Sequence, residues 1–183
     1  MMKIRMIGAV DKKDIRASVR TRLRMLTSDE KNRQSKKLCK RALSHRLFSE
    51  SRVIALFVSL KDEPETRDLI AQLSEKHRVV LPRVEGDIMQ FYNYTPSSMR
   101  IGSFGIEEPC DGTPISPRDI DVIFVPGVAF TQKGTRLGRG KGYYDKYMSQ
   151  DGFRAYRIGY CFKEQIVENI PCEKHDVKVQ EML

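Results

Sequence analysis

Apolar residues in the first part of the chain recur at helical spacing. Ile15, Val19, Leu23 and Leu26 fall on one face of a helix that we expect Asp11 to cap. The stretch "TSDE" at 27–30 fits a capping box and opens a second helix. The inward positions of that second helix are Leu38, Ala42, Leu43 and Leu47. The pattern predicts two basic amphipathic helices arranged as an N-terminal hairpin.

Short apolar runs after residue 50 predict the strands of a sheet. "RVIALFVSL" (52–60) and "DVIFVPG" (121–127) are typical of strands buried on both faces of a parallel sheet. We expect further strands at "VVLP" (79–82), "AYRIGY" (155–160) and "VKV" (177–179), and a more exposed edge strand at "IMQFYNY" (88–94). Helical stretches are expected at 66–76, 143–148 and 163–167. This alternation predicts a single three-layer α/β/α domain over residues 1–183, with a mostly parallel, Rossmann-like sheet.

The composition supports one compact domain. The chain has 183 residues, of which 40% are hydrophobic. No apolar run approaches the length of a bilayer span, and the N-terminus lacks the long apolar region of a signal peptide. The cysteines are scattered without a CxxC pair, so we expect reduced thiols in a cytoplasmic protein with no membrane attachment. They are Cys39, Cys110, Cys161 and Cys172.

The formal net charge of +9 is unevenly distributed. The segment 12–41 holds twelve Lys or Arg residues against three acidic residues, so it carries the whole excess. A surface of this kind could bind nucleic acid or a polyanionic small molecule, or could simply be solvated.

The stretch "GTRLGRGKGYYD" (134–145) is the main candidate for chemistry. Glycines let backbone N–H groups approach an anion closely, and a concavity of such groups attracts phosphates. Arg136, Arg139 and Lys141 add full positive charges, and the following helix adds its N-terminal dipole. Asp145 would repel phosphates unless a cation lay between them, which points to Mg²⁺. The stretch therefore predicts a site for the phosphates of a nucleotide and their metal ion.

Glycine spacing alone leaves a second interpretation open. The stretch is neither the GxxxxGK[ST] motif nor a GxGxxG motif directly after a strand, so a flexible basic surface loop is the alternative. The Tyr-Tyr-Asp that follows argues against it, since aromatic residues rarely crowd a flexible linker.

A longer segment, "FVPGVAFTQKGTRLGRGKGYYDKYM" (124–148), resembles the signature of the 5-formyltetrahydrofolate cyclo-ligase family, also known as 5,10-methenyltetrahydrofolate synthetases. The likeness runs from about Lys12 to Val179 and includes "KKDIR", "SLKDEPET", "FGIEEP" and "FKEQIVENIPCEKHDVKV". Residues 1–10 precede the usual start of the family and are expected to be an extension. Gln180 stands where an acidic residue is common.

The resemblance implies an enzyme that uses MgATP as co-substrate to close 5-formyltetrahydrofolate into 5,10-methenyltetrahydrofolate. Its partners would be ATP and a reduced folate, with no nucleic acid and a monomeric state. It implies Asp145 and Asp176 as metal ligands, and a folate site made by Val58, Glu63, Arg139, Gly140, Lys141, Gly142 and Tyr143. We expect Arg139 and Lys141 to be the catalytic residues, because their charges can stabilise the transferring phosphoryl group. The implied ATP-binding residues are Lys12, Lys13, Arg16, Arg136, Leu137, Gly138, Arg139, Gly140, Lys141, Gly142, Tyr143 and Tyr144.

Two other functions compete with this one. An RNA-binding protein could use the basic helices, and its binding would weaken steeply with salt. None of the sequence signatures of RNA-recognition modules is present, and such a protein has no use for Asp145 beside the glycines. The other alternative is an ATP-dependent phosphotransferase acting on a different small molecule.

Overall fold

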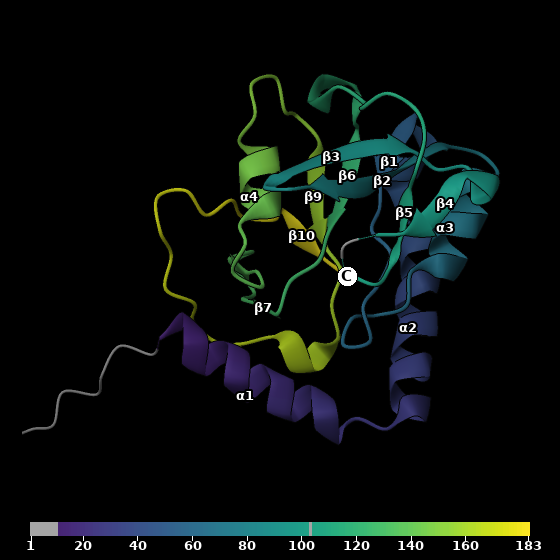
Figure 1. Ribbon diagram of the computed structural model, residues 1–183. Coiled ribbons are helices and arrows are strands. Elements are labelled where there is room, and N and C mark those ends of the chain that lie inside the picture. The colour runs from purple at the N-terminus through teal and green to yellow at the C-terminus, as the bar shows by residue number, and fades with distance from the viewer. Residues whose placement is uncertain (1–10, 103) are drawn as a thin grey trace, which may run out of the picture.

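Six strands form the main sheet of the computed structural model, which describes residues 11–102 and 104–183. All neighbours in the sheet are parallel except for the antiparallel pair at one edge, so the mostly parallel sheet is confirmed. The expected extension at residues 1–10 lies outside the described residues. In sheet order the strands are β10 (Glu181–Met182), β9 (Tyr156–Gly159), β6 (Val122–Val125), β1 (Val53–Ala55), β2 (Arg78–Glu85) and β3 (Ile88–Asn93) (Figure 1).

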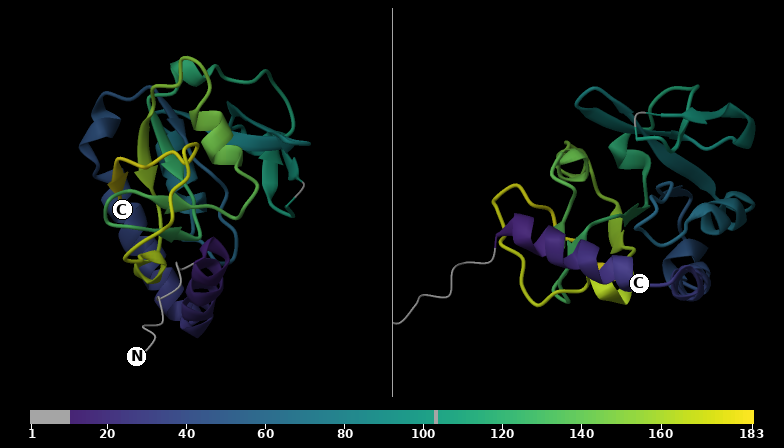
Figure 2. Two further views of the ribbon diagram at one scale, coloured as in Figure 1. Left: turned by 90° about the vertical axis from the view of Figure 1, so that its left-hand side faces the viewer. Right: turned by 60° about the horizontal axis from the view of Figure 1, so that its bottom comes forward.

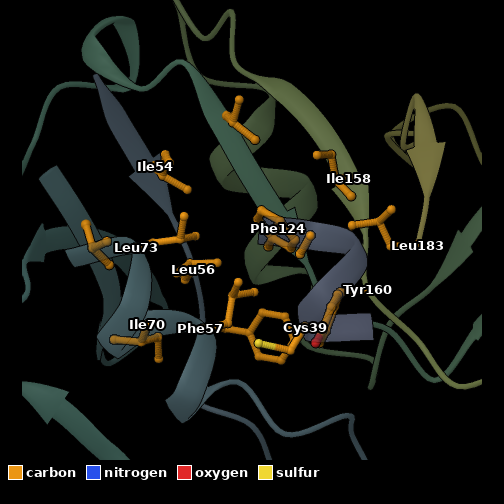
Figure 3. Packing of buried hydrophobic residues seen from close by; sticks show 14 of the residues in the cluster. Cys39, Ile54, Leu56, Phe57, Ile70, Leu73, Phe124, Ile158, Tyr160 and Leu183 are labelled. Atoms are coloured by element: carbon orange, nitrogen blue, oxygen red, sulfur yellow. The ribbon is translucent and has the colours of Figure 1, made fainter. Parts of the chain in front are cut away.

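Helices cover both faces of this sheet. Successive residues of a strand point to opposite faces, so Phe124 of β6 and Ile123 beside it belong to different apolar clusters. The Phe124 cluster packs against α2 (Ser28–Leu43) and α3 (Arg67–Ser74), as the labelled side chains of Figure 3 show. The Ile123 cluster packs against α4 (Tyr143–Met148). The three-layer α/β/α architecture is therefore confirmed.

The two basic N-terminal helices form, but they diverge. Helix α1 (Lys12–Met25) runs across one end of the domain, whereas α2 runs along the sheet (Figures 1 and 2). The buried face of α1 packs against β7 (Ala129–Phe130) and the 3₁₀ turn η4 (Lys163–Gln165). The hairpin is open because each helix buries its apolar stripe on a different part of the domain.

The helix caps differ in part from the expectation. The Asp11 side chain makes no capping hydrogen bond. The Thr27 hydroxyl accepts a hydrogen bond from the backbone N–H of Glu30, but the Glu30 carboxylate binds Arg33 and Gln34 and does not turn back. Only half of the expected capping box is therefore present.

The expected strand at 177–179 is wrong, and the last strand lies at Glu181–Met182. The backbone N–H of Val177 donates to the side chain of Asp145, and that of Val179 donates to the carbonyl of Gly134. These residues therefore tie the C-terminal segment to the glycine-rich stretch before the chain reaches the sheet edge.

The remaining elements are short. Two antiparallel pairs were not foreseen, β4 (Met99–Ile101) with β5 (Glu107–Pro109), and β7 with β8 (Arg136–Leu137). The other 3₁₀ turns are Arg46–Ser49, Pro96–Ser98 and Pro117–Asp119. All four cysteines are free, and two of them, Cys39 and Cys161, are buried. Within the described ranges, no helix combines the length and apolar character needed to cross a membrane.

Gly134 provides a test of how the glycine-rich stretch is anchored. Its φ is +78°, and an added Cβ would collide with the carbonyl oxygen of Val179. Gly134→Ala should therefore lower the free energy of unfolding by about 3 kcal/mol, measured by urea denaturation. Gly86→Ala is the matched control, because Gly86 has φ +59° but an added Cβ there would meet no atom within 4 Å, so it should cost only about 1 kcal/mol. Equal losses in the two variants would contradict the anchoring role.

Candidate functional site

A cavity of about 160 Å³ lies where the chain leaves the carboxyl ends of β1 and β6. Ligands of open α/β sheets usually bind at this edge. Its walls are mostly apolar, with a few charged residues that come from the glycine-rich stretch and from two other segments. The apolar lining includes Phe57, Val58, Pro82, Val84, Met89, Phe104 and Ile106.

A buried ion pair closes the glycine-rich stretch at its two ends. Nη2 of Arg136, on β8, lies 2.7 Å from Oδ2 of Asp145, on α4, and the Arg136 side chain is only 3% exposed. Nη1 of Arg136 also donates to the carbonyl of Pro126 at 3.3 Å. Oδ1 of Asp145 accepts the backbone N–H of Val177 at 3.1 Å. Arg136, which was expected to contact ATP, therefore connects the two ends of the loop by pairing with Asp145. Asp145 also joins the loop to the C-terminal segment.

The segment between these ends is open and glycine-rich. Gly140 and Gly142 have φ of +107° and +69°, a region that favours glycine. Nε of Arg16, on α1, donates to the carbonyl of Gly138 at 2.9 Å, so the first helix supports the loop. Leu137 is buried with the apolar face of α1, which leaves only its backbone for ligand contact.

Arg139 is held by two carboxylates at the mouth of the cavity. Its Nη2 lies 2.6 Å from Oδ1 of Asp62 and 3.0 Å from Oε1 of Glu63. Burial raises the pKa of Glu63, although the hydrogen bond from the backbone N–H of Leu60 and the charge of Arg139 act in the opposite direction. The expected folate residue and the expected phosphate residue are therefore in direct contact.

Lys12 and Asp176 also pair with each other. Nζ of Lys12 lies 2.8 Å from Oδ2 of Asp176 and 2.8 Å from Oε1 of Glu173. Burial disfavours the charged amine, but the hydrogen bonds to these two carboxylates outweigh it and raise the pKa of Lys12. Lys13, the next residue, is exposed. Lys12 and Arg16 therefore lie at the end of α1 that is near the glycine-rich loop, whereas Lys13 faces solvent.

The two tyrosines of the stretch have different surroundings. The Tyr143 hydroxyl donates to the carbonyl of Gly86 at 3.1 Å, and its ring meets Phe104 edge-on. The Tyr144 hydroxyl is buried and has no hydrogen-bond partner among the described residues. Burial and the charge of Glu63 raise the pKa of Tyr144 above its ordinary value. Both tyrosines line the cavity, and so does the exposed Lys141.

The two expected metal ligands are compatible with Mg²⁺ held largely by phosphate. In the parts of the chain that the structure describes, no cluster of three or more His, Cys, Asp or Glu side chains is arranged for a metal. Asp145 accepts the N–H of Val177, the residue next to Asp176, and the Asp176 carboxylate accepts from Lys12 and from the N–H of Glu173. Each carboxylate keeps lone pairs beyond these hydrogen bonds. Mg²⁺ at nucleotide sites is commonly held by one or two carboxylates together with phosphate oxygens and water. The residues therefore fit this ion.

Comparison with known proteins identifies the family. A model of the 5-formyltetrahydrofolate cyclo-ligase family matches residues 9–183. The chain belongs to this family. The 5-formyltetrahydrofolate cyclo-ligase of Mus musculus is 34% identical, over 94% of this chain and 92% of its own. That of Escherichia coli K12 is 31% identical, over 87% of this chain and 92% of its own.

A solved structure agrees with both the family and the fold. The NMR structure of Aquifex aeolicus 5,10-methenyltetrahydrofolate synthetase matches with a TM-score of 0.84 and 32% identity, covering 93% of this chain and 88% of that one. This cyclo-ligase family member is accordingly an enzyme, a ligase, with the expected α/β fold.

Several residues of the cavity were not anticipated from the sequence. Glu108 carries charge into the cavity, Phe104 faces Tyr143, and Asp62 pairs with Arg139 at the mouth. Asp62 and Glu63 stand in "KDEPET", and two adjacent acidic residues are as typical of a helix start as of a binding site. Alternation along "GIEEP" could have separated an inward Glu108 from an outward Glu107, but only once the segment was known to be a strand.

The Arg136–Asp145 pair makes a prediction about stability. Asp145→Asn leaves a nearly buried guanidinium without its counter-charge, so the free energy of unfolding should fall by about 3 kcal/mol. Denaturation should be followed in the presence of EDTA, so that no metal contributes. Asp151→Asn is the control, because Asp151 is 98% exposed beside Arg118 and should change stability by about 0.5 kcal/mol or less. An unchanged midpoint for Asp145→Asn would contradict the structural role.

Proposed function

We propose that this cyclo-ligase family member converts 5-formyltetrahydrofolate into 5,10-methenyltetrahydrofolate, using MgATP and releasing ADP and phosphate. The observation that carries the proposal is the contact between Glu63 and Arg139, because it joins an apolar cavity to the glycine-rich loop. The proposed partners are therefore ATP and a reduced folate, and we propose that the protein acts as a monomer. A cytoplasmic location and the absence of a nucleic-acid partner stay predictions.

The cavity suits the pterin ring of the folate. Val58 and the other apolar residues would pack on the ring faces, and a buried carboxylate matches paired N–H groups. Glu63 is such a carboxylate, and we assign it to the amino and N3–H edge of the ring. The remainder of the folate would leave through the mouth, beside Tyr143.

The glycine-rich loop suits the triphosphate. Backbone N–H groups at 138–142 would approach the phosphates closely, and Arg139 and Lys141 would neutralise the transferring group. Lys12 and Arg16 would close on the more distant phosphates. Since Lys12 and Arg139 are already paired with carboxylates, nucleotide binding would exchange those partners for phosphate oxygens.

The chemical step needs activation of a poor electrophile. Transfer of the γ-phosphoryl group to the formyl oxygen releases ADP and turns that oxygen into a leaving group. N10 then attacks the formyl carbon and loses its proton, and the C–O bond breaks to release phosphate. The protein aligns the two substrates and stabilises the charge of the transferring phosphoryl group, with Arg139 and Lys141 as the catalytic residues.

Asp145 and Asp176 would hold Mg²⁺, which, when bound, would neutralise charge on the phosphate oxygens. In this role Asp145 would keep the hydrogen bonds that it accepts from Arg136 and from the N–H of Val177. The hydrogen bond that Asp176 accepts from Lys12 would adjust.

Lys141 provides a direct test of the phosphate site. With MgATP and 5-formyltetrahydrofolate, methenyl-folate formation gives near-ultraviolet absorbance, and Lys141→Ala should reduce kcat by roughly 100- to 1,000-fold. Its fold should be intact because the side chain is exposed. Lys146→Ala removes another exposed lysine, five residues further on, and should keep wild-type turnover. Near-normal kcat in Lys141→Ala would remove this residue from the mechanism.

Metal dependence follows from the two carboxylates. Excess EDTA should abolish methenyl-folate formation, and added Mg²⁺ should restore it. Asp176→Asn should raise the Mg²⁺ concentration needed for half-maximal rate by about tenfold, since one of two ligands loses its charge. Full turnover in EDTA with metal-free reagents would rule out the metal.

A further inference from the structure

Glu108 is a buried carboxylate in the cavity wall that the proposed chemistry does not use. It lies on β5 and is 4% exposed. Among the described residues it has no ion-pair partner within 4 Å, because Arg83 lies 2.7 Å from Glu85 and also donates to the carbonyls of Pro109 and Cys110. Burial raises the pKa of Glu108, although a backbone hydrogen bond from Val84 and the nearby charges of Arg100 and Arg83 act the other way. A buried carboxylate facing a cavity is costly unless a ligand completes its hydrogen bonds.

The backbone beneath Glu108 is shaped to hold this side chain. An added Cβ at Gly102 would overlap the carboxyl group of Glu108. The N–H of Gly102 donates to the carbonyl of Ile106 at 2.8 Å, which fixes the turn between β4 and β5. Glu107, the preceding residue, is exposed on the opposite face of the strand. The inward position of Glu108 is therefore built into the β4–β5 pair.

Glu63 and Glu108 are separate acceptors. Glu63 lies in the loop after β1, and the charges of Arg139 and Asp62 act on its pKa. Glu108 lies on the two-stranded β4–β5 sheet, and the charges of Arg100, Arg83 and Glu85 act on its pKa. Two carboxylates on different wall segments fit a ligand that has two separate N–H donor positions. They do not fit a pair of carboxylates that share one proton between them.

A reduced pterin ring has these two donor positions. If Glu63 takes the amino and N3–H edge, the remaining ring donor is N8–H, because N5 carries the formyl group. In a fully oxidised pterin, N8 has no hydrogen and presents a lone pair instead. A buried carboxylate facing that lone pair would be repelled and left without a donor, and sites of this kind reject the wrong analogue strongly.

We propose that Glu108 accepts a hydrogen bond from N8–H of the reduced pterin ring and thereby selects tetrahydrofolates over fully oxidised folates. The inference rests on the proposed function, and it makes Glu108 a specificity-determining residue of the same cavity.

Binding measurements on wild type and Glu108→Gln test this directly. Glutamine keeps the size of the side chain, and its amide can accept from N8–H or donate to an unprotonated N8. By calorimetry without ATP, wild type should bind 5-formyltetrahydrofolate more tightly than folic acid, and Glu108→Gln should reduce that ratio by roughly 10- to 100-fold. The Kd for MgATP should not change. KM for 5-formyltetrahydrofolate should rise while kcat at saturation stays within about threefold, as expected when uniform binding is lost. The matched control is Glu107→Gln, which should leave the ratio unchanged.

A modified ligand provides a measurement that does not depend on any variant folding. In the 8-deaza analogue of 5-formyltetrahydrofolate, CH₂ replaces N8–H. Wild type should bind this analogue roughly 10- to 100-fold more weakly than the parent, and Glu108→Gln should show little further loss. Equal affinity of wild type for the two ligands would overturn the role of Glu108, as would an unchanged ratio in Glu108→Gln. A wild-type protein that binds no reduced folate would instead overturn the proposed function, and this inference with it.

Discussion

The buried ion pair between Arg136 and Asp145 is the interaction on which the site depends. It joins β8 to the first turn of α4, so the glycine-rich residues 138–142 lie within a segment that is fixed at both ends. Its further hydrogen bonds reach Pro126 after β6 and Val177 in the C-terminal segment. A segment with so few packing side chains could not hold a defined shape by burial, so the ion pair supplies the constraint that a core would otherwise give.

Charge balance around this loop explains how so many cations can be gathered at one place. Arg139 is paired with Asp62 and Glu63, and Lys12 is paired with Glu173 and Asp176. Like charges are therefore separated by carboxylates until an anion replaces them. Because Glu63 also faces the apolar cavity, the proposed folate and the proposed triphosphate would meet at a single ion pair. In the proposed function, this arrangement would link the occupancy of one half of the site to the charge state of the other.

The sequence pattern predicted the layers of the fold because they follow from continuous apolar strands and amphipathic helices. Strands such as 122–125 are buried on both faces, and their sequence shows it. The open N-terminal hairpin and the misplaced last strand follow from tertiary contacts. Val177 and Val179 have ideal strand character, yet their N–H groups bind Asp145 and Gly134.

The part of the candidate site whose charged residues stand close together in the sequence could be predicted. Arg139, Lys141 and Asp145 stand in one stretch whose glycines mark it, and the family resemblance added Glu63 and Asp176. Neither signal predicted that Arg136 would be buried and paired with Asp145. Glu108 was missed because an isolated acid in a short edge pair resembles any surface acid until its burial is known.

The most direct test of the central claim is an amide chemical-shift titration of the folded protein with MgATP. If the ion pair holds the loop ready for a triphosphate, the largest shifts should fall on Gly138, Gly140 and Gly142, at an MgATP concentration that saturates turnover. Shifts confined to the basic face of α2, or no shifts at all with 5-formyltetrahydrofolate present, would contradict the account.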